Sequence, residues 1–362
     1  MLHLATENKT PTSEYCDDAP PGRETVDELV FVRLGGVSQA VHICGHDARS
    51  PLLLFLHGGP GMPHMPFAHA NAALQRDFLV VHWDQRGAGK SYSPALNGGD
   101  LCIEQLVSDA RELILWLGAR FRKSTVVLVG HSWGSALGAI VAARFPRLVS
   151  TFIGIGQVSN LRTAEGMRFH QATGLARQLG DRTAMIALTR LGPPPYARPA
   201  QSDSLERWAQ RLNSRCYAPV TPATFLRLGL SSPVYSWFDV AQIPLGRRFS
   251  ERCLWGEIFR QIDLFAQVPR LDVPVYFLVG RHDSIVTHEL ARRYCDALEA
   301  PRGKTFITFE RSGHWPHLEE SELFRAILTG PVRQHLAHEW RASAGRPPIA
   351  IGQWDSPEGV AA

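Results

Sequence analysis

Three residues in this sequence could together cleave an acyl bond. They are Ser132, within the segment Gly130-His131-Ser132-Trp133-Gly134, and then Asp283 and His314 further along the chain. A serine hydroxyl becomes an effective nucleophile when an imidazole takes its proton as it attacks, and a carboxylate behind the imidazole fixes the tautomer. The set therefore predicts catalysis by Ser132, with His314 as the base and Asp283 supporting it.

The segment around Ser132 has the pattern of a strand, one tight turn and a helix. Residues 124–129 are β-branched or apolar after the first serine, and residues 135–145 are rich in helix formers. The motif G-x-S-x-G in this setting predicts a nucleophile elbow, in which the glycines make room for a strained serine backbone. In such a sharp turn the neighbouring His131 points elsewhere, so we expect it to have a structural or pocket-lining role.

The rest of the chain alternates between expected strands and helices. Residues 28–44 read as a hairpin, and short apolar runs predict further buried strands at 51–56, 78–83, 124–129, 149–155, 273–280 and 304–310. The helices expected between and after them span 67–76, 103–117, 135–145, 289–298 and 321–338. This alternation predicts an α/β fold with a mostly parallel central sheet and helices on both faces.

The three candidate residues each follow an expected strand, at the sheet edge where parallel α/β sheets bind ligands. Serine, then aspartate, then histidine is the chain order of α/β-hydrolase triads and differs from the two common serine-protease orders. The fold class that we expect is therefore the α/β-hydrolase fold.

The alternation of expected strands and helices is interrupted over one long stretch. Residues 157–265 are Arg-rich, dotted with Trp and Pro, and carry helical patches without a clear buried strand, so we expect an inserted helical cap. The α/β core is then expected over 25–156 and 266–340. Residues 1–24 and the Pro/Gly-rich tail 341–362 are expected to be loosely docked or poorly ordered.

Composition excludes several classes of protein. The 362 residues are 44% hydrophobic and 20% charged, which is ordinary for a soluble globular protein, and the net charge of +4 comes without a basic stripe, so we expect no nucleic-acid partner. The six cysteines are scattered, which argues against a zinc site and favours free thiols in a reducing compartment. The N-terminus lacks the features of a secretory signal and no apolar stretch approaches the ~20 residues of a membrane span, so a cytoplasmic protein without a membrane partner is expected.

The tetrahedral intermediate of acyl transfer needs preorganised donors for its oxyanion, each worth ~3 kcal/mol. One expected donor is the backbone N–H that follows the nucleophile, that of Trp133. The other should come from His57-Gly58-Gly59-Pro60-Gly61, the Gly-rich loop after the strand at 51–56. We expect Gly59 to supply it.

A second motif invites a different reading. Gly89-Lys90-Ser91 is similar to the end of a phosphate-binding P-loop, but that motif requires glycine where Asp84 stands. Nucleotide binding is therefore not expected, and the region around Arg86 is predicted to brace the loops near the active site.

The ordered motifs resemble the proline iminopeptidase family of α/β hydrolases. The resemblance rests on HGGPG (57–61), DQRGAGKS (84–91) and GHSWGS (130–135), followed by Gly-Arg-x-Asp and Gly-His-x-x-x-x-Glu, and it covers roughly 28–156 and 270–335. It implies that Ser132, Asp283 and His314 are the triad and that Gly59 and Trp133 form the oxyanion hole. It also implies a helical cap over the site, a small-molecule or short-peptide substrate, and neither a metal nor an organic cofactor.

The cap is where the sequence departs from that family. Iminopeptidases usually carry a Trp-x-x-Trp-Glu-like stretch there, whose acid helps to hold the α-ammonium of the substrate, and residues 157–265 contain none. The candidate substitutes are Glu206, Asp239 and Glu257, each near a tryptophan, although the sequence favours a solvated helix residue over a ligand at each of these positions.

The alternatives therefore remain an esterase, lactonase or amidase of small metabolites, or a ligand-binding scaffold without turnover. An epoxide hydrolase or dehalogenase would carry a carboxylate at the nucleophile position, and Ser132 argues against that. The oligomeric state is left open.

Overall fold

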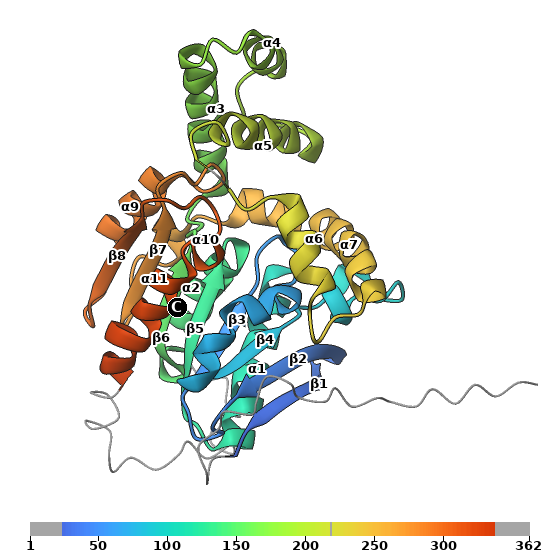
Figure 1. Ribbon diagram of the computed structural model, residues 1–362, viewed down its shortest axis with the longest axis vertical. Helices are drawn as coiled ribbons and strands as arrows, with labels where there is room; N and C mark the ends of the chain where they lie inside the picture. The colour runs from blue at the N-terminus through green and yellow to red at the C-terminus, as the bar shows by residue number, and fades with distance from the viewer. Residues whose placement is uncertain (1–23, 218, 337–362) are drawn as a thin grey trace, which may run out of the picture.

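A computed structural model of the chain describes residues 24–217 and 219–336 (Figure 1). Within these ranges one sheet has eight strands in the order β1-β2-β4-β3-β5-β6-β7-β8. The strands are β1 (Val26–Leu34), β2 (Val37–Gly45), β3 (Leu52–Leu56), β4 (Leu79–Trp83), β5 (Val126–His131), β6 (Val149–Ile155), β7 (Val275–Gly280) and β8 (Lys304–Phe309). β2 pairs antiparallel with both β1 and β4, and all other pairs are parallel. The expected hairpin and mostly parallel sheet are confirmed.

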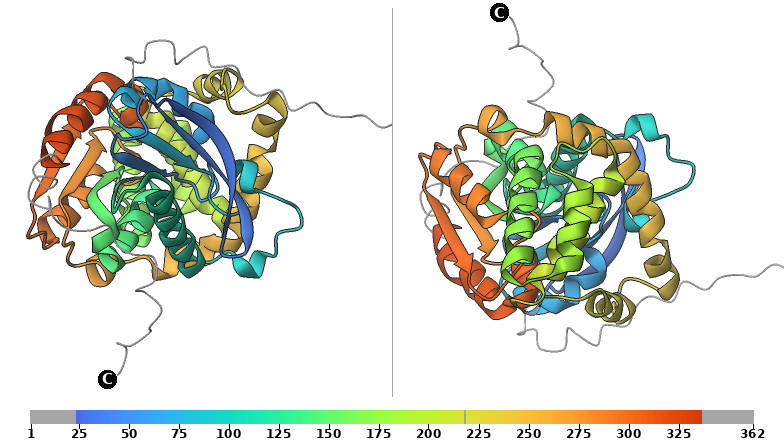
Figure 2. Two further views of the ribbon diagram at one scale, coloured as in Figure 1. Left: turned by 90° about the horizontal axis from the view of Figure 1, so that it is seen from below. Right: turned by 90° about the horizontal axis from the view of Figure 1, so that it is seen from above.

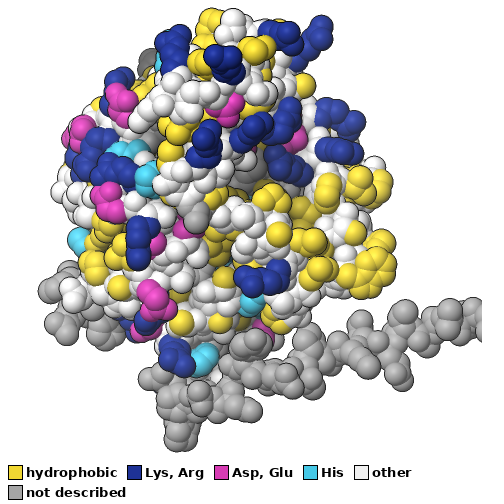
Figure 3. All heavy atoms as spheres, turned by 45° about the horizontal axis from the view of Figure 1, so that its top comes forward, with side chains coloured by type: hydrophobic (Ala, Val, Ile, Leu, Met, Phe, Trp, Pro, Cys, Tyr) yellow, Lys and Arg dark blue, Asp and Glu magenta, His cyan; other side chains and the backbone are white. Residues whose placement is uncertain are grey.

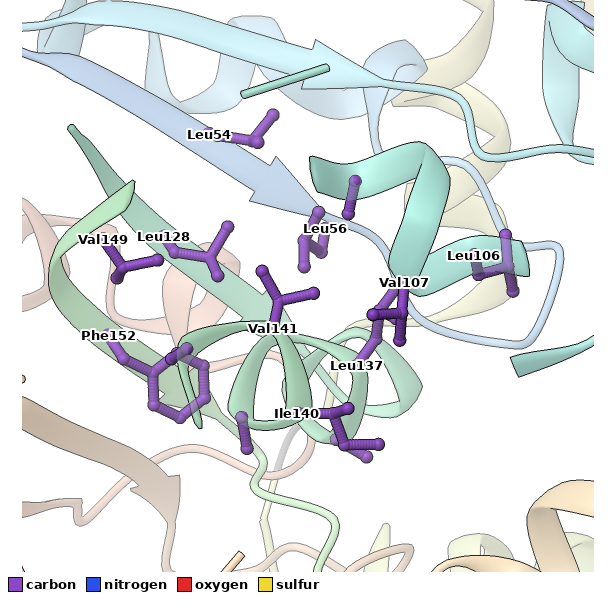
Figure 4. Close-up of a cluster of buried hydrophobic side chains, with 14 of the residues drawn as sticks. Leu54, Leu56, Leu106, Val107, Leu128, Leu137, Ile140, Val141, Val149 and Phe152 are labelled. Carbon is purple, nitrogen blue, oxygen red and sulfur yellow. The ribbon is translucent and has the colours of Figure 1, made fainter. Parts of the chain in front are cut away.

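Helices bury both faces of the sheet, because neighbouring side chains on a strand point to opposite sides. Leu128 packs in one apolar cluster with Val107 and Val141, whereas Val127 packs in the other (Figure 4). The first face is covered by α1 (Ile103–Phe121), α2 (Trp133–Arg144) and α9 (His288–Ala297), and the second by η1 (Met65–Arg76), α11 (Ser321–Ile327) and η5 (Leu328–Val332). Short turns η2 (Gly89–Ser91), η3 (Gly98–Asp100), η4 (Pro146–Leu148) and α10 (Pro316–Glu319) lie in the loops.

The chain between β6 and β7 is helical. It forms α3 (Leu161–Gln178), α4 (Arg182–Leu191), α5 (Pro199–Asn213), α6 (Pro222–Leu230), α7 (Trp237–Gln261) and α8 (Leu264–Gln267). Helices α3, α4 and α5 form a lobe that stands above the carboxyl edge of the sheet and has its own apolar cluster, including Leu188, Leu205 and Leu212 (Figures 1 and 2). By contrast, α7 lies on the core, where Ser250 Oγ donates a hydrogen bond of 3.1 Å to Gly87 O. The insertion thus has a free-standing part, the α3–α5 lobe, and a docked part.

The surface of the insertion is basic with apolar side chains between. Figure 3 shows Lys and Arg side chains (dark blue) over the lobe end of the molecule and hydrophobic side chains (yellow) toward the α6–α7 side. Trp237 and Leu230, with exposed fractions of 73% and 56%, belong to that apolar surface. Of the helices in the described ranges, none combines the length and the hydropathy that crossing a bilayer would require.

The last helix differs from the expectation of one regular helix over 321–338. α11 ends at Ile327 and the chain continues as a π-helical turn, η5, which contains Pro331. Proline has no N–H to donate to the carbonyl four residues earlier, so a wider turn replaces the regular helix there. Residues 337 and 338, together with the expected arm up to residue 23 and the tail 341–362, lie outside the described residues.

A chain of buried histidines crosses the apolar cluster beneath η1. His64 Nε2 lies 3.0 Å from His317 Nε2, and His64 Nδ1 lies 3.4 Å from His82 Nδ1. Phe55 stacks on both His64 and His82, with ring centroids 5.2 and 4.9 Å apart. Each nitrogen pair needs one N–H donor and one acceptor, so the arrangement is that of neutral rings.

Candidate active site

Ser132 occupies the turn between β5 and α2. Its backbone has a positive φ (φ 54°, ψ −122°), outside the helical and extended regions, and its N–H donates to Ile155 O of the neighbouring strand at 2.9 Å. A side chain at Gly130 would overlap the carbonyl oxygen of Gly134, and one at Gly134 would overlap that of Leu56. The glycines are therefore required by close backbone approach, and Ser132 has the strained geometry expected of a nucleophile elbow.

Asp283 and His314 lie together in the loops that follow β7 and β8, the last two parallel strands of the sheet. His314 Nδ1 is 2.8 Å from Asp283 Oδ2, and the Asp283 side chain has an exposed fraction of 0%. The other carboxylate oxygen, Oδ1, accepts hydrogen bonds from the backbone N–H groups of Ile285 (2.8 Å) and Val286 (3.0 Å). The carboxylate is held by donors on both sides, which assigns the N–H to His314 Nδ1 and leaves Nε2 as the basic nitrogen.

The electrostatic environment of His314 favours its protonated form. Burial by itself would lower the pKa of the imidazole, but the charge of Asp283, the hydrogen bond between them, and the charges of Glu206 and Glu319 raise it overall. A base with a raised pKa accepts the serine proton more readily, so the arrangement fits a general base in nucleophilic catalysis.

Gly156 makes the Asp283–His314 pair possible, and the sequence analysis missed it. It follows β6 directly with φ +53°, and a Cβ there would lie 3.1 Å from His314 Cε1 and 3.3 Å from Asp283 Oδ2. A substituent would push on both partners. The sequence did carry a signal for this role, because Gly156 comes immediately after the buried strand β6, which lies beside the elbow strand β5.

The Gly-rich loop 57–61 lies against the elbow. A Cβ at Gly58 would be 2.9 Å from Ser132 Cβ, and Gly59 has φ +114°, a region that favours glycine. Trp133, the other expected oxyanion donor, is the first residue of α2, and its buried indole donates to Gln85 Oε1 at 3.3 Å. The loop and the helix N-terminus thus lie on either side of Ser132.

The region around Arg86 braces these loops, as the sequence analysis expected. Gln85 N donates to His57 Nε2 at 3.0 Å, and Gln85 Nε2 donates to His57 O at 2.8 Å. Arg86 makes a buried two-pronged ion pair with Asp109, with both N–O distances 2.9 Å. Lys90 pairs with Asp239 at 2.7 Å, which accounts for the basic group of the P-loop-like motif.

The three candidate cap acids lie in different places. Glu206, on α5, has its Oε2 3.9 Å from Arg168 Nη1, and its charge acts on His314. Asp239 caps the N-terminus of α7, where it accepts from Ser236 N at 2.8 Å, and it also pairs with Lys90. Glu257 accepts from Ile103 N at 3.2 Å, at the start of α1. Glu206 also accepts a hydrogen bond of 3.0 Å from Gln210 Nε2, so all three acids have structural contacts, and Glu206 is the one whose charge raises the pKa of His314.

His131 contacts the backbone of the histidine loop, the segment after β8 that carries His314. Its Nε2 lies 2.8 Å from His314 O and its ring packs on Trp315 with centroids 4.3 Å apart. Burial lowers its pKa well below the ordinary value, so the ring is neutral and donates to the carbonyl. Within the described residues, no group of three or more His, Cys, Asp or Glu side chains is arranged to hold a metal ion.

Comparisons with known proteins agree with the fold. A profile of the alpha/beta hydrolase fold family matches residues 51–321. The probable aminopeptidase YbaC of Bacillus subtilis (strain 168) is 34% identical over 321 residues, which cover 87% of this chain and 99% of YbaC. The proline iminopeptidase of Levilactobacillus brevis is 28% identical over 80% of this chain and 91% of its own length. The crystal structure of proline iminopeptidase from Mycobacterium smegmatis shares the fold, with a TM-score of 0.60 at 21% identity, over 86% of this chain and all of that one.

Proposed function

This chain belongs to the alpha/beta hydrolase family, and we propose that it is a serine aminopeptidase that releases N-terminal residues, proline among them, from short peptides. The observation that carries the proposal is the Asp283–His314 pair at the sheet edge that also presents Ser132 on its elbow. The similarity to YbaC and, at lower identity, to proline iminopeptidases supports the choice of an amide substrate with a free amino terminus.

In the proposed mechanism Ser132 Oγ attacks the scissile carbonyl while His314 Nε2 takes its proton. Asp283 keeps the imidazole in the required tautomer and stabilises the imidazolium. The backbone N–H groups of Gly59 and Trp133 stabilise the oxyanion. His314 then returns the proton to the leaving amine, and a water molecule deprotonated by the same imidazole hydrolyses the acyl-enzyme.

Glu206 is the residue that we propose to bind the substrate α-ammonium. In an aminopeptidase substrate this ammonium belongs to the same residue as the scissile carbonyl and is separated from it only by Cα, so its acceptor must be close to the triad. The Glu206 side chain is one-third exposed, its contacts are to Arg168 and Gln210 of the lobe, and its charge raises the pKa of His314, whereas Asp239 and Glu257 bind backbone N–H groups at helix N-termini. A carboxylate in that place stabilises an ammonium by a charge-assisted hydrogen bond.

The test compares turnover of prolyl-p-nitroanilide, its N-acylated form and a short p-nitrophenyl ester, with Ser132→Ala as the blank. A preference for the unblocked prolyl amide is expected. Glu206→Gln should raise KM for that substrate about tenfold or more while leaving ester turnover close to that of the parent. Glu257→Gln is the matched control, since glutamine can still accept the hydrogen bond from Ile103 N.

Two results would contradict the proposal. Ester turnover without prolyl activity would favour a small-molecule esterase, which is the alternative that the altered cap leaves open. Equal losses in Glu206→Gln and Glu257→Gln would remove Glu206 from the ammonium site.

A further inference from the structure

Glu319 joins the catalytic histidine loop to the cap. It is the last residue of α10, five residues after His314. Its Oε2 accepts a hydrogen bond of 2.7 Å from the N–H of Gly313, and its Oε1 accepts one of 3.0 Å from the N–H of Val220. Gly313 directly precedes His314, and Val220 lies in the linker from α5 to α6. One carboxylate therefore holds both segments.

A second residue of the cap linker, Tyr217, lies beside this carboxylate and contacts both Gly313 and the loop after β7. The ring of Tyr217 stacks on His282, with centroids 4.8 Å apart and planes 11° apart, and a side chain at Gly313 would overlap the Tyr217 hydroxyl. Gly313 is thus covered by Tyr217 of the cap linker, and a larger residue there would displace that ring. The position of the linker and the position of the histidine loop are consequently coupled.

The contacts of Glu319 are those of an ionised carboxylate. Both backbone partners are donors, which favour the charged form. Burial raises the pKa of Glu319 above its ordinary value overall, although the backbone hydrogen bonds from Val220 and Gly313 and the charge of His314 oppose that effect. The charge acts in the other direction as well, since it is one of the groups that raise the pKa of His314.

The titratable groups around His314 come from every element packed on it. The core contributes Asp283 in the loop after β7, His131 at the end of β5, and His317 and Glu319 on α10. The cap contributes Glu206 on α5. Tyr217, in the cap linker, faces Glu319 and Asp283. Asp283 contacts the imidazole directly. The negative charges that act on His314 besides Asp283 are Glu206 and Glu319.

We propose that Glu319 is a positioning residue for the reaction, fixing the His314 loop against the cap linker and stabilising the protonated imidazole through its charge. The inference rests on the proposed function, because it takes His314 as the base that activates Ser132. A purely structural tie would hold the loop without altering the proton affinity of His314. The two roles can therefore be separated by a pH profile.

The experiment measures the rate at which a fluorophosphonate labels Ser132 between pH 6 and pH 9, which needs no knowledge of the natural substrate. Glu319→Gln should move the acid limb of the profile to lower pH by about 0.5 unit or more, because removing the negative charge lowers the proton affinity of His314. It should also reduce the plateau rate. Glu319→Asp keeps the charge and shortens the tether, so its acid limb should stay in place while its plateau falls.

Glu320→Gln is the matched control. Glu320 Oε2 accepts from Arg311 N at 3.0 Å and from Ser312 Oγ at 2.6 Å, so it holds the same loop, and its charge is paired with Arg311. The acid limb of the pH profile of Glu320→Gln should coincide with that of the parent protein. An unshifted acid limb in a folded, labelled Glu319→Gln variant would overturn the inference, as would equal shifts in Glu319→Gln and Glu320→Gln. Absence of Ser132-dependent labelling in the parent would instead overturn the proposed function.

Discussion

Acidification should destabilise this fold far more than it destabilises an ordinary globular protein, because five buried histidines are neutral in the folded state. Burial lowers the pKa of His57 to about 4 and that of His64 to about 3, and it lowers the other three well below the ordinary value of 6.5. The five are His57, His64, His82, His131 and His317. Well above pH 6.5 these histidines are unprotonated in both the folded and the unfolded state. Below pH 6.5 they bind protons in the unfolded chain but not in the folded chain, so the free energy of unfolding decreases as the pH is lowered.

The size of the effect follows from proton linkage. Between pH 7.5 and pH 5.5 a histidine with an unfolded pKa of 6.5 that stays neutral when folded costs about 1.4 kcal/mol, and five such groups cost about 7 kcal/mol. Asp84 acts in the opposite direction: burial raises its pKa to about 7, so the folded state takes up its proton first and recovers about 2 kcal/mol. The net loss from these six groups is then about 5 kcal/mol, comparable with the whole stability of many domains, and His314, whose pKa is raised, offsets part of it.

The assay is urea unfolding at pH 7.5, 6.5 and 5.5, followed by the fluorescence of the nine tryptophans. His64→Gln should reduce the loss by about 1.4 kcal/mol, since it removes one of the five groups. His170→Gln, at an exposed position on α3, should leave the pH dependence unchanged. A change in the free energy of unfolding below about 1 kcal/mol over this pH range would refute the reasoning, because it would mean that the buried rings take up protons without unfolding.

Two further substitutions test the framework around the site. Gly156→Ala places a Cβ 3.1 Å from His314 Cε1 at φ +53°, so we expect Ser132 labelling to slow by about tenfold to a hundredfold, with unchanged circular dichroism. Gly166→Ala, where the Cβ meets open space, is its control, and equal rates in the two variants would contradict the expectation. Arg86→Met leaves the Asp109 carboxylate buried without its cation and should cost about 3–5 kcal/mol in urea unfolding, whereas Arg293→Met, which breaks an exposed pair with Glu289, should have little effect. Similar losses in both arginine variants would show that burial of the Arg86 pair is not the cause.

The sequence predicted those parts of the fold that depend on local pattern. The elbow was predictable because its glycines and its strand and helix neighbours lie within a few residues of Ser132. The positions of Asp283 and His314 followed from the strand rhythm, since parallel strands place their carboxyl ends at one edge. Pro331 was also a local signal that the last helix would be interrupted, although a regular helix was expected across it over 321–338.

The cap contacts could not be predicted in the same way. Glu206, Asp239 and Glu257 all lie on polar helix surfaces near a tryptophan, and local pattern does not distinguish them. What separates them is tertiary: Asp239 meets Lys90, which is 149 positions away, and Glu257 meets Ile103, which is 154 positions away. The tie from Glu319 to Val220 spans 99 positions and joins two loops, for which no periodicity exists.

The separate apolar cluster of the α3–α5 lobe makes this part of the chain an exchangeable module. Its interior residues, such as Leu188 and Leu205, contact one another and not the sheet, so the sheet and the elbow keep their packing when the lobe changes. Lobe sequences can then diverge, or be grafted from a relative, and alter what reaches Ser132 at no cost to the core. For engineering, the lobe is the place to diversify, and the Arg168 contact to Ile285 O and the Val220 contact to Glu319 are the junctions to preserve.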